Sequence, residues 1–173
     1  MDDAHMTEGG ASHLFLPVGA RDHVQGPMGA AVTLLEYGDF ECAHCAAAFP
    51  HVREVRRWLR GELCYVFRHF PVAEKHSYAF RAAEAAEAAG AQERFWEMHE
   101  LLCEHGSTLN DLHVTHYAQK LGLDFERFER ELRQHVHLEK VRRDFTSGIE
   151  SGVSDTPTIF INGLRYEGAH DTD

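Results

Sequence analysis

The sequence of 173 residues has few basic side chains, only four cysteines and no long apolar run. Seventeen lysines and arginines stand against 28 acidic residues, and the resulting formal net charge of −11 repels phosphate backbones and anionic lipid surfaces. No uninterrupted apolar stretch approaches the roughly 20 residues that cross a bilayer. We therefore expect neither nucleic-acid binding nor membrane insertion. The length and the 43% of hydrophobic residues suffice for one domain with a buried core.

The N-terminus, Met1–His5, lacks the basic start and apolar stretch of a secretory signal. As the sequence stands, this predicts a cytoplasmic protein, whereas a leader removed from a precursor would predict a periplasmic or other extracytoplasmic one. The 14 histidines are scattered and show no H-E-x-x-H spacing, so most are expected to be solvated surface residues. We expect no bound cofactor and no metal.

Two of the cysteines form a C-x-x-C motif, Cys42-Ala43-His44-Cys45, shortly after the apolar run 32–37. Two cysteines one helical turn apart at a strand-to-helix junction are typical of a thiol–disulfide redox centre. A zinc knuckle also uses C-x-x-C, but zinc usually takes four protein ligands and the sequence has no second C-x-x-C. Cys64 and Cys103 stand alone, and we expect both to be buried and free.

Hydrophobic periodicity predicts an α/β organisation. Residues 1–30 are a glycine-rich lead-in with at most one edge strand, at His13–Val18. The further elements expected are a strand over 31–37, a helix over 42–59, a strand over 63–70, a helical insert over about 74–151 and a hairpin with strands near 158–163 and 164–167. The first three form a βαβ unit with parallel strands. Its helix carries Cys45 on the core-facing stripe and Cys42 at the exposed tip.

This order of elements, together with the segment Gly152–Gly163, resembles the DsbA-like branch of the thioredoxin superfamily over about residues 32–168. The segments around Cys42, at 67–71 and at Thr156-Pro157-Thr158 are similar to those of bacterial members that stand alone or are fused to sodium/proton antiporters. The resemblance implies a thioredoxin-like fold with an inserted all-helical sub-domain, and one such domain over residues 31–173.

The sequence departs from that family at three points. Ala43 stands where proline is common, and Asp155 stands where glycine is usual. The closing helix of the family has no counterpart here. These departures concern potency and substrate choice more than the fold.

We expect Cys42 to be the nucleophile, because a helix N-terminus stabilises a thiolate and lowers its pKa. Cys45 is then the resolving thiol. His44 is expected to stabilise the thiolate by a hydrogen bond or a positive charge, and the resemblance marks a histidine in this place as typical of oxidising members. The alternative is a solvated histidine without such a role.

Strand alternation places Glu36 on the same face as Leu34, below the cysteines. In that position a buried carboxyl with a raised pKa would transfer the proton of Cys45. The alternative is that Glu36 is a plain surface glutamate. The resemblance further implies that Thr156 and a cis Pro157 form a loop against the disulfide, which with Val153 binds an extended substrate. Alternatively, Thr-Pro merely starts a strand.

The sequence thus predicts a monomeric thiol–disulfide oxidoreductase that exchanges disulfides with protein substrates through Cys42 and Cys45 and has an unidentified electron-transfer partner. Three alternatives stay open at this point. They are a cytosolic disulfide reductase, a redox-sensing domain fused to or docking on a membrane transporter, and a module in which the two cysteines and nearby histidines bind a metal.

Overall fold

The structure, a computed structural model, describes residues 13–106 and 109–168, so the prediction for residues 1–12 lies outside it. Within the described residues five strands form one sheet in the order β1-β3-β2-β4-β5. Their bounds are His23–Gln25 for β1, Val32–Gly38 for β2, Leu63–His69 for β3, Thr158–Ile161 for β4 and Leu164–Arg165 for β5. β2 and β3 are parallel, and the other neighbours are antiparallel.

Helix α1, Ala43–Leu59, connects β2 to β3 and confirms the predicted βαβ unit. Its core-facing residues are Cys45, Ala48, Phe49 and Val52, close to the stripe that the spacing predicts. Arg60, the C-cap residue, adopts a positive φ of 35°, and the helix ends at Leu59 as the predicted range has it. A short 3₁₀ turn, Arg60–Glu62, then leads into β3.

Five of the described helices lie in the long stretch between β3 and β4. They are α2 (Ala79–Gly90), α3 (Phe95–His105), α4 (Asp111–Lys120), α5 (Phe125–Arg133) and α6 (Leu138–Glu150). Asn110 and Asp124 cap α4 and α5 through side-chain oxygens that accept backbone N–H groups, as their positions predict. The boundary between a lead-in and a domain at residues 30 and 31 stays a prediction.

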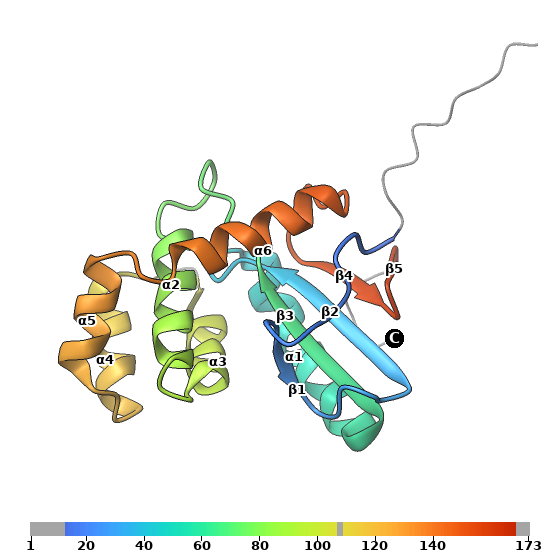
Figure 1. Ribbon diagram of the computed structural model, residues 1–173, viewed down its shortest axis with the longest axis horizontal. Coiled ribbons are helices and arrows are strands. Elements are labelled where there is room, and N and C mark those ends of the chain that lie inside the picture. The colour runs from blue at the N-terminus through green and yellow to red at the C-terminus, as the bar shows by residue number, and fades with distance from the viewer. Residues whose placement is uncertain (1–12, 107–108, 169–173) are drawn as a thin grey trace, which may run out of the picture.

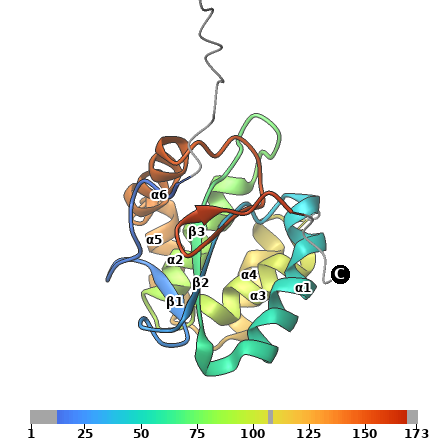
Figure 2. The ribbon, with the colours of Figure 1, turned by 90° about the vertical axis from the view of Figure 1, so that its right-hand side faces the viewer.

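The two faces of the sheet are covered differently, because alternate residues of each strand point to opposite sides. Leu34, Tyr65 and Phe67 belong to the larger core, which α1 and the helices α2 to α5 complete. Leu35 and Val66 belong to a smaller core, which is covered by the segment before β1 and by α6. Figure 1 shows α2 to α5 grouped beside the sheet, and Figure 2 shows α1 and α6 on opposite sides of it.

The lead-in differs from its prediction. His13–Val18 is not a strand, apart from a single bridge between His13 and Leu164, and the edge strand of the sheet is β1. The reason is the buried guanidinium of Arg68, which donates hydrogen bonds to the carbonyl oxygens of Leu16 and Pro17 at 2.8 and 3.0 Å. Carbonyl groups that bind a guanidinium in this way are not available to a strand ladder.

The hairpin near the end of the described chain agrees with its prediction. Asn162 and Gly163 have φ values of 49° and 79°, which is the conformation of a two-residue turn between antiparallel strands. Among the helices described here, none is both long and apolar enough to span a bilayer.

Candidate active site

Cys42 lies at the junction that the sequence indicates, between the end of β2 and the first turn of α1, where it is the N-cap residue. The prediction of an exposed tip is wrong, because only 5% of the residue is exposed. The loop of Thr156 and Pro157, joined by a cis peptide bond as expected, covers it. The Cys42 thiol donates a hydrogen bond to the Thr156 carbonyl at 3.2 Å.

The two cysteines of the motif have opposite acidities. The pKa of Cys42 falls from 9.0 to about 5. The largest cause is a hydrogen bond from the Cys45 thiol, and the backbone N–H groups of His44 and Cys45 lower the pKa further, whereas burial raises it. Burial, the thiol's hydrogen bond to Cys42 and the charge of Glu36 raise the pKa of Cys45 well above its usual value. Near neutral pH, Cys42 is therefore a thiolate and Cys45 a thiol, whose proton stabilises the neighbouring sulfur.

The imidazole of His44 is exposed, on the first turn of α1. The hydrogen bond by which this residue lowers the pKa of Cys42 comes from its backbone N–H and not from its ring. The role expected for the imidazole thus stays a prediction, and the structure assigns a role to the peptide group instead.

Glu36 lies on the face of β2 that sequence alternation predicts, and 5% of it is exposed. The Tyr65 hydroxyl donates a hydrogen bond to its Oε2 at 2.8 Å. Burial raises the pKa of Glu36 from 4.5 to about 7, although the Tyr65 bond and the charge of Arg56 oppose the rise. The proton-transfer role stays a prediction, and this pKa suits a group that gains and loses a proton near neutrality.

Tyr65 and Arg56 belong to the surroundings of Glu36, and sequence reasoning missed both. The Arg56 guanidinium carbon lies 5.0 Å from the centre of the Tyr65 ring and 5.8 Å from that of Trp96. The signal that could have identified Tyr65 is its place in β3, two residues before Phe67, the residue paired with Glu36. Nothing in the sequence indicated Arg56.

Asp39 is a second residue that the sequence did not single out. Its backbone N–H lies 3.5 Å from Cys45 Sγ, and its carboxylate, with 2% of the residue exposed, accepts hydrogen bonds from its neighbours. The donors are Glu41 N at 2.9 Å, Val72 N at 2.8 Å and His76 Nδ1 at 2.8 Å. Asp39 therefore fixes the chain just before the motif to the loop after β3. The pattern showed only a Gly-Asp turn.

Of the substrate-binding residues expected, Thr156 and Pro157 lie against Cys42, but Val153 does not lie on the surface. Only 3% of Val153 is exposed, and it packs in the smaller core. Its contact with a substrate stays a prediction that this position does not favour. Cys64 and Cys103 are buried and free, as expected.

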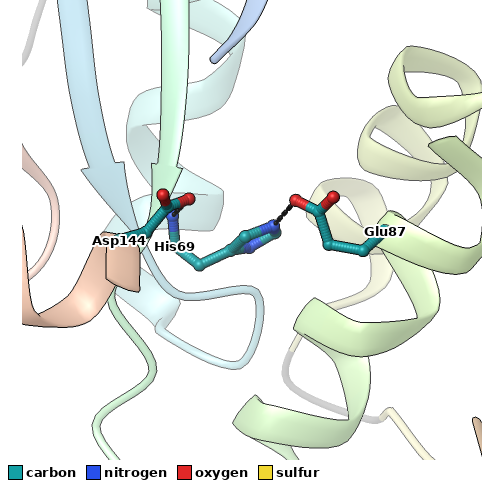
Figure 3. A group of neighbouring side chains, drawn as sticks. All are labelled: His69, Glu87 and Asp144. Carbon is teal, nitrogen blue, oxygen red and sulfur yellow. Dashed lines mark hydrogen bonds and ion pairs between the residues drawn. The ribbon is translucent and has the colours of Figure 1, made fainter. Parts of the chain in front are cut away.

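A separate buried cluster lies between β3, α2 and α6 and consists of His69, Glu87 and Asp144 (Figure 3). His69 Nε2 lies 2.8 Å from Glu87 Oε1, and the His69 backbone N–H donates to Asp144 at 3.3 Å. It is the one grouping of potential metal ligands among the described residues, and it contains neither Cys42 nor Cys45. The ammonium of Lys140 lies 2.5 Å from Asp144 and 3.7 Å from Glu87, so a cation already pairs with these two carboxylates.

Comparison with known proteins agrees with this fold. The model of a family described as thioredoxin matches residues 20–173. Solved structures with the same fold include a thioredoxin-like oxidoreductase from Silicibacter pomeroyi, with a TM-score of 0.76 and 23% identity over 87% of this chain and 85% of that one. Another is the thiol-disulfide exchange protein alpha-DsbA2 from Wolbachia pipientis, with a TM-score of 0.75 and 19% identity over 85% and 79%. These likenesses show the predicted thioredoxin-like α/β fold.

Curated relatives carry a different name. The Na(+)/H(+) antiporter NhaA 1 of Salinispora arenicola is 45% identical over 93% of this chain and 25% of that protein. The antiporter NhaA 1 of Mycolicibacterium vanbaalenii is 42% identical over 87% and 25%. The chain thus spans about a quarter of the length of the relatives it matches. Their names agree with the predicted similarity to members fused to antiporters.

Proposed function

Because this chain belongs to the thioredoxin family, we propose that it is a thiol–disulfide oxidoreductase that exchanges disulfides with protein substrates through Cys42 and Cys45. The observation that carries the proposal is the opposite acidity of the two thiols, with Cys42 at a pKa of about 5 and Cys45 well above 9.0. A structural pair of thiols needs no such difference, whereas disulfide exchange requires one sulfur that is a thiolate and a good leaving group.

Each turnover is a two-electron exchange. In the oxidising direction, a substrate thiolate attacks Cys42 Sγ of the Cys42–Cys45 disulfide, which forms a mixed disulfide and releases the Cys45 thiolate. A second substrate thiolate then attacks the substrate sulfur of the mixed disulfide and releases Cys42 as a thiolate. The substrate has lost two electrons to the pair. Because the pKa of Cys42 lies near 5, it is a good leaving group at neutral pH.

Glu36 supports this exchange by handling the proton of Cys45. Cys45 leaves as a thiolate but is stable only as a thiol, because burial raises its pKa, so it must gain a proton in one direction and lose it in the other. Glu36 has a pKa of about 7 and its charge acts on Cys45, which suits the donor and acceptor of that proton. Tyr65 holds the carboxyl in place.

The Thr156–Pro157 loop is proposed as the site where a substrate chain binds. The Thr156 carbonyl oxygen lies 3.2 Å from Cys42 Sγ, so the loop backbone lies beside the reactive sulfur. An extended substrate segment that pairs with this backbone would bring its own cysteine next to Cys42. Specificity for thiols in extended or unfolded segments follows from such main-chain recognition.

The direction favoured is oxidation of substrate thiols, because a stabilised Cys42 thiolate favours the reduced protein and makes its disulfide a stronger oxidant. Net oxidation requires an oxidising compartment and an electron acceptor that reoxidises the pair. We therefore propose function outside the reducing cytosol, with free protein thiols as substrates. In a reducing cytosol the same pair would act as a disulfide reductase.

The test is an equilibrium titration of metal-free protein in glutathione buffers, with trapped thiols counted by mass. A chain with Cys64→Ala and Cys103→Ala keeps only the motif cysteines, and the same chain with Cys45→Ala is the matched control. We expect a reversible two-electron couple in the first and none in the second. A potential near about −120 mV means an oxidase, and one near about −270 mV a reductase. Absence of the couple, together with stoichiometric metal in the protein as purified, would show a metal-binding module instead.

A further inference from the structure

A second site lies at the C-terminal end of α1, the end opposite to Cys42, where residues of β1 and the start of β3 also line it. It is a pocket of about 320 Å³, at the lower end of the range of about 300–1,000 Å³ that is usual for small-molecule sites. Four arginines line it together with Gln25, Gly26 and Leu63, and no acidic residue lines it. They are Arg53, Arg56, Arg57 and Arg60. In a chain whose net charge is −11, this is an unusual concentration of positive charge.

The arginines of the pocket are only partly neutralised. The acidic groups nearest to them are partly exposed glutamates at long ion-pair distances: Glu104 at 3.5 Å from Arg53, Glu100 at 3.8 Å from Arg56 and Glu54 at 3.5 Å from Arg57. Exposed pairs of this kind contribute little to stability. The carbonyl end of α1 accounts for about half a unit of negative charge, and Arg60 Nε bonds one of its carbonyls. A surplus of positive charge is left.

Arg56 supplies the independent observation. Its Nη2 bonds the Gln25 side chain, but its Nη1 is buried and has no hydrogen-bond partner among the described residues. A buried donor on a charged group is destabilising when it lacks a partner. Arg56 lines the pocket, so an anion bound there would compensate the charge of its guanidinium group.

We propose that this pocket binds a phosphate-bearing anion, held by the arginine guanidinium groups. Planar guanidinium groups bind phosphate oxygens in pairs, which is why arginines in a concave site favour phosphate over chloride. The phosphate belongs either to a small soluble molecule or to a lipid headgroup. Trp58, 60% exposed on the same helix, is a side chain of the kind found at membrane surfaces.

The pocket is connected to the redox pair through three side chains. Arg56 packs on the ring of Tyr65, whose hydroxyl bonds Glu36, and the positive charge of Arg56 lowers the pKa of Glu36. An anion bound at Arg56 offsets that charge, so the pKa of Glu36 moves upward when the pocket is filled. This effect is a binding readout that does not depend on disulfide exchange.

The experiment titrates pyrophosphate into the full chain at constant ionic strength in chloride and follows binding by calorimetry. We expect saturable binding that Arg57→Gln with Arg60→Gln weakens at least tenfold and that Arg60→Gln alone weakens severalfold. Arg142→Gln removes an exposed arginine of α6, outside the pocket, and should change the affinity less than twofold. Carboxyl NMR of Glu36 should show an upward pKa shift with pyrophosphate.

A second arm distinguishes the source of the phosphate. The protein is sedimented with vesicles of phosphatidylglycerol and, for comparison, of phosphatidylcholine. If the protein binds the phosphatidylglycerol vesicles and pyrophosphate releases it, the ligand is a lipid headgroup. If the protein binds pyrophosphate but neither kind of vesicle, the ligand is a soluble anion. Lack of saturable binding in both arms overturns the proposal. The proposal is also overturned if the Arg57/Arg60 variant binds pyrophosphate as tightly as the wild type, or if Arg142→Gln weakens binding as much as that variant does. A Glu36 pKa that pyrophosphate does not move overturns the contact with Arg56. Each outcome is independent of whether the chain exchanges disulfides.

Discussion

The low pKa of Cys42 predicts that the free energy of unfolding of the reduced protein changes with pH. The oxidised protein has no free Cys42 thiol, so it lacks this contribution. The folded pKa is about 5 and the unfolded value is 9.0. Since the folded pKa is the lower one, the contribution is fully present above the unfolded pKa and is lost as pH falls through the folded pKa. At pH 7 it is about 2.7 kcal/mol, and at pH 5 about 0.4 kcal/mol.

The difference between the two redox forms isolates this group. Unfolding of reduced and of oxidised protein is measured in urea at several pH values, and the two free energies are subtracted, so that most other titrating carboxylates cancel. We expect the difference to move by about 2.3 kcal/mol in favour of the reduced form between pH 5 and 7. The pH 7 contribution corresponds to a disulfide about 60 mV more oxidising than one with an unperturbed thiol.

A difference that stays flat between pH 5 and 7 would refute the reasoning, because it would mean that Cys42 is not a thiolate in this range. The Cys45→Ala variant provides the control. The hydrogen bond from Cys45 is the largest cause of the low pKa, so in that variant thiolate absorbance should titrate at a higher pH than in the wild type.

Three further predictions concern the surroundings of the site. The rate at which Cys45 resolves a mixed disulfide should show an inflection near pH 7 that Glu36→Gln abolishes, as measured by stopped flow, because burial sets the Glu36 pKa to about 7. Tyr65→Phe removes a hydrogen bond that lowers this pKa and should move the inflection upward by about 1 unit; an inflection that stays in place would show that Tyr65 does not act on Glu36. Gly148→Ala should lower the free energy of unfolding by about 1–3 kcal/mol, because the added Cβ would lie 2.6 Å from Phe70. Gly61 has open space around it, so Gly61→Ala should change the free energy of unfolding by less than about 0.5 kcal/mol. Equal effects of the two substitutions would contradict this packing argument.

Local patterns decided the elements around the site. The apolar run 32–37 specified β2, and the helical spacing after Cys42 specified α1. A helix of that length between two strands returns the chain to the same edge, which makes β2 and β3 parallel. Strand alternation alone placed Glu36 on the correct face, and an Asn-Gly pair predicted the hairpin turn. Each of these inferences uses residues that are neighbours in the sequence, where the backbone geometry fixes direction.

Long-range contacts decided the rest. The covering of Cys42 by Thr156, the Tyr65–Glu36 hydrogen bond and the attachment of the lead-in to Arg68 join residues that are 114, 29 and about 50 positions apart. Hydrophobic periodicity in the sequence does not predict contacts between residues so far apart. The sequence by itself determined which cysteines are the candidates for the sulfur chemistry and which elements present them. Only the tertiary structure decided their burial and pKa values, because desolvation and hydrogen bonding depend on which distant segments close over a group once the chain has packed.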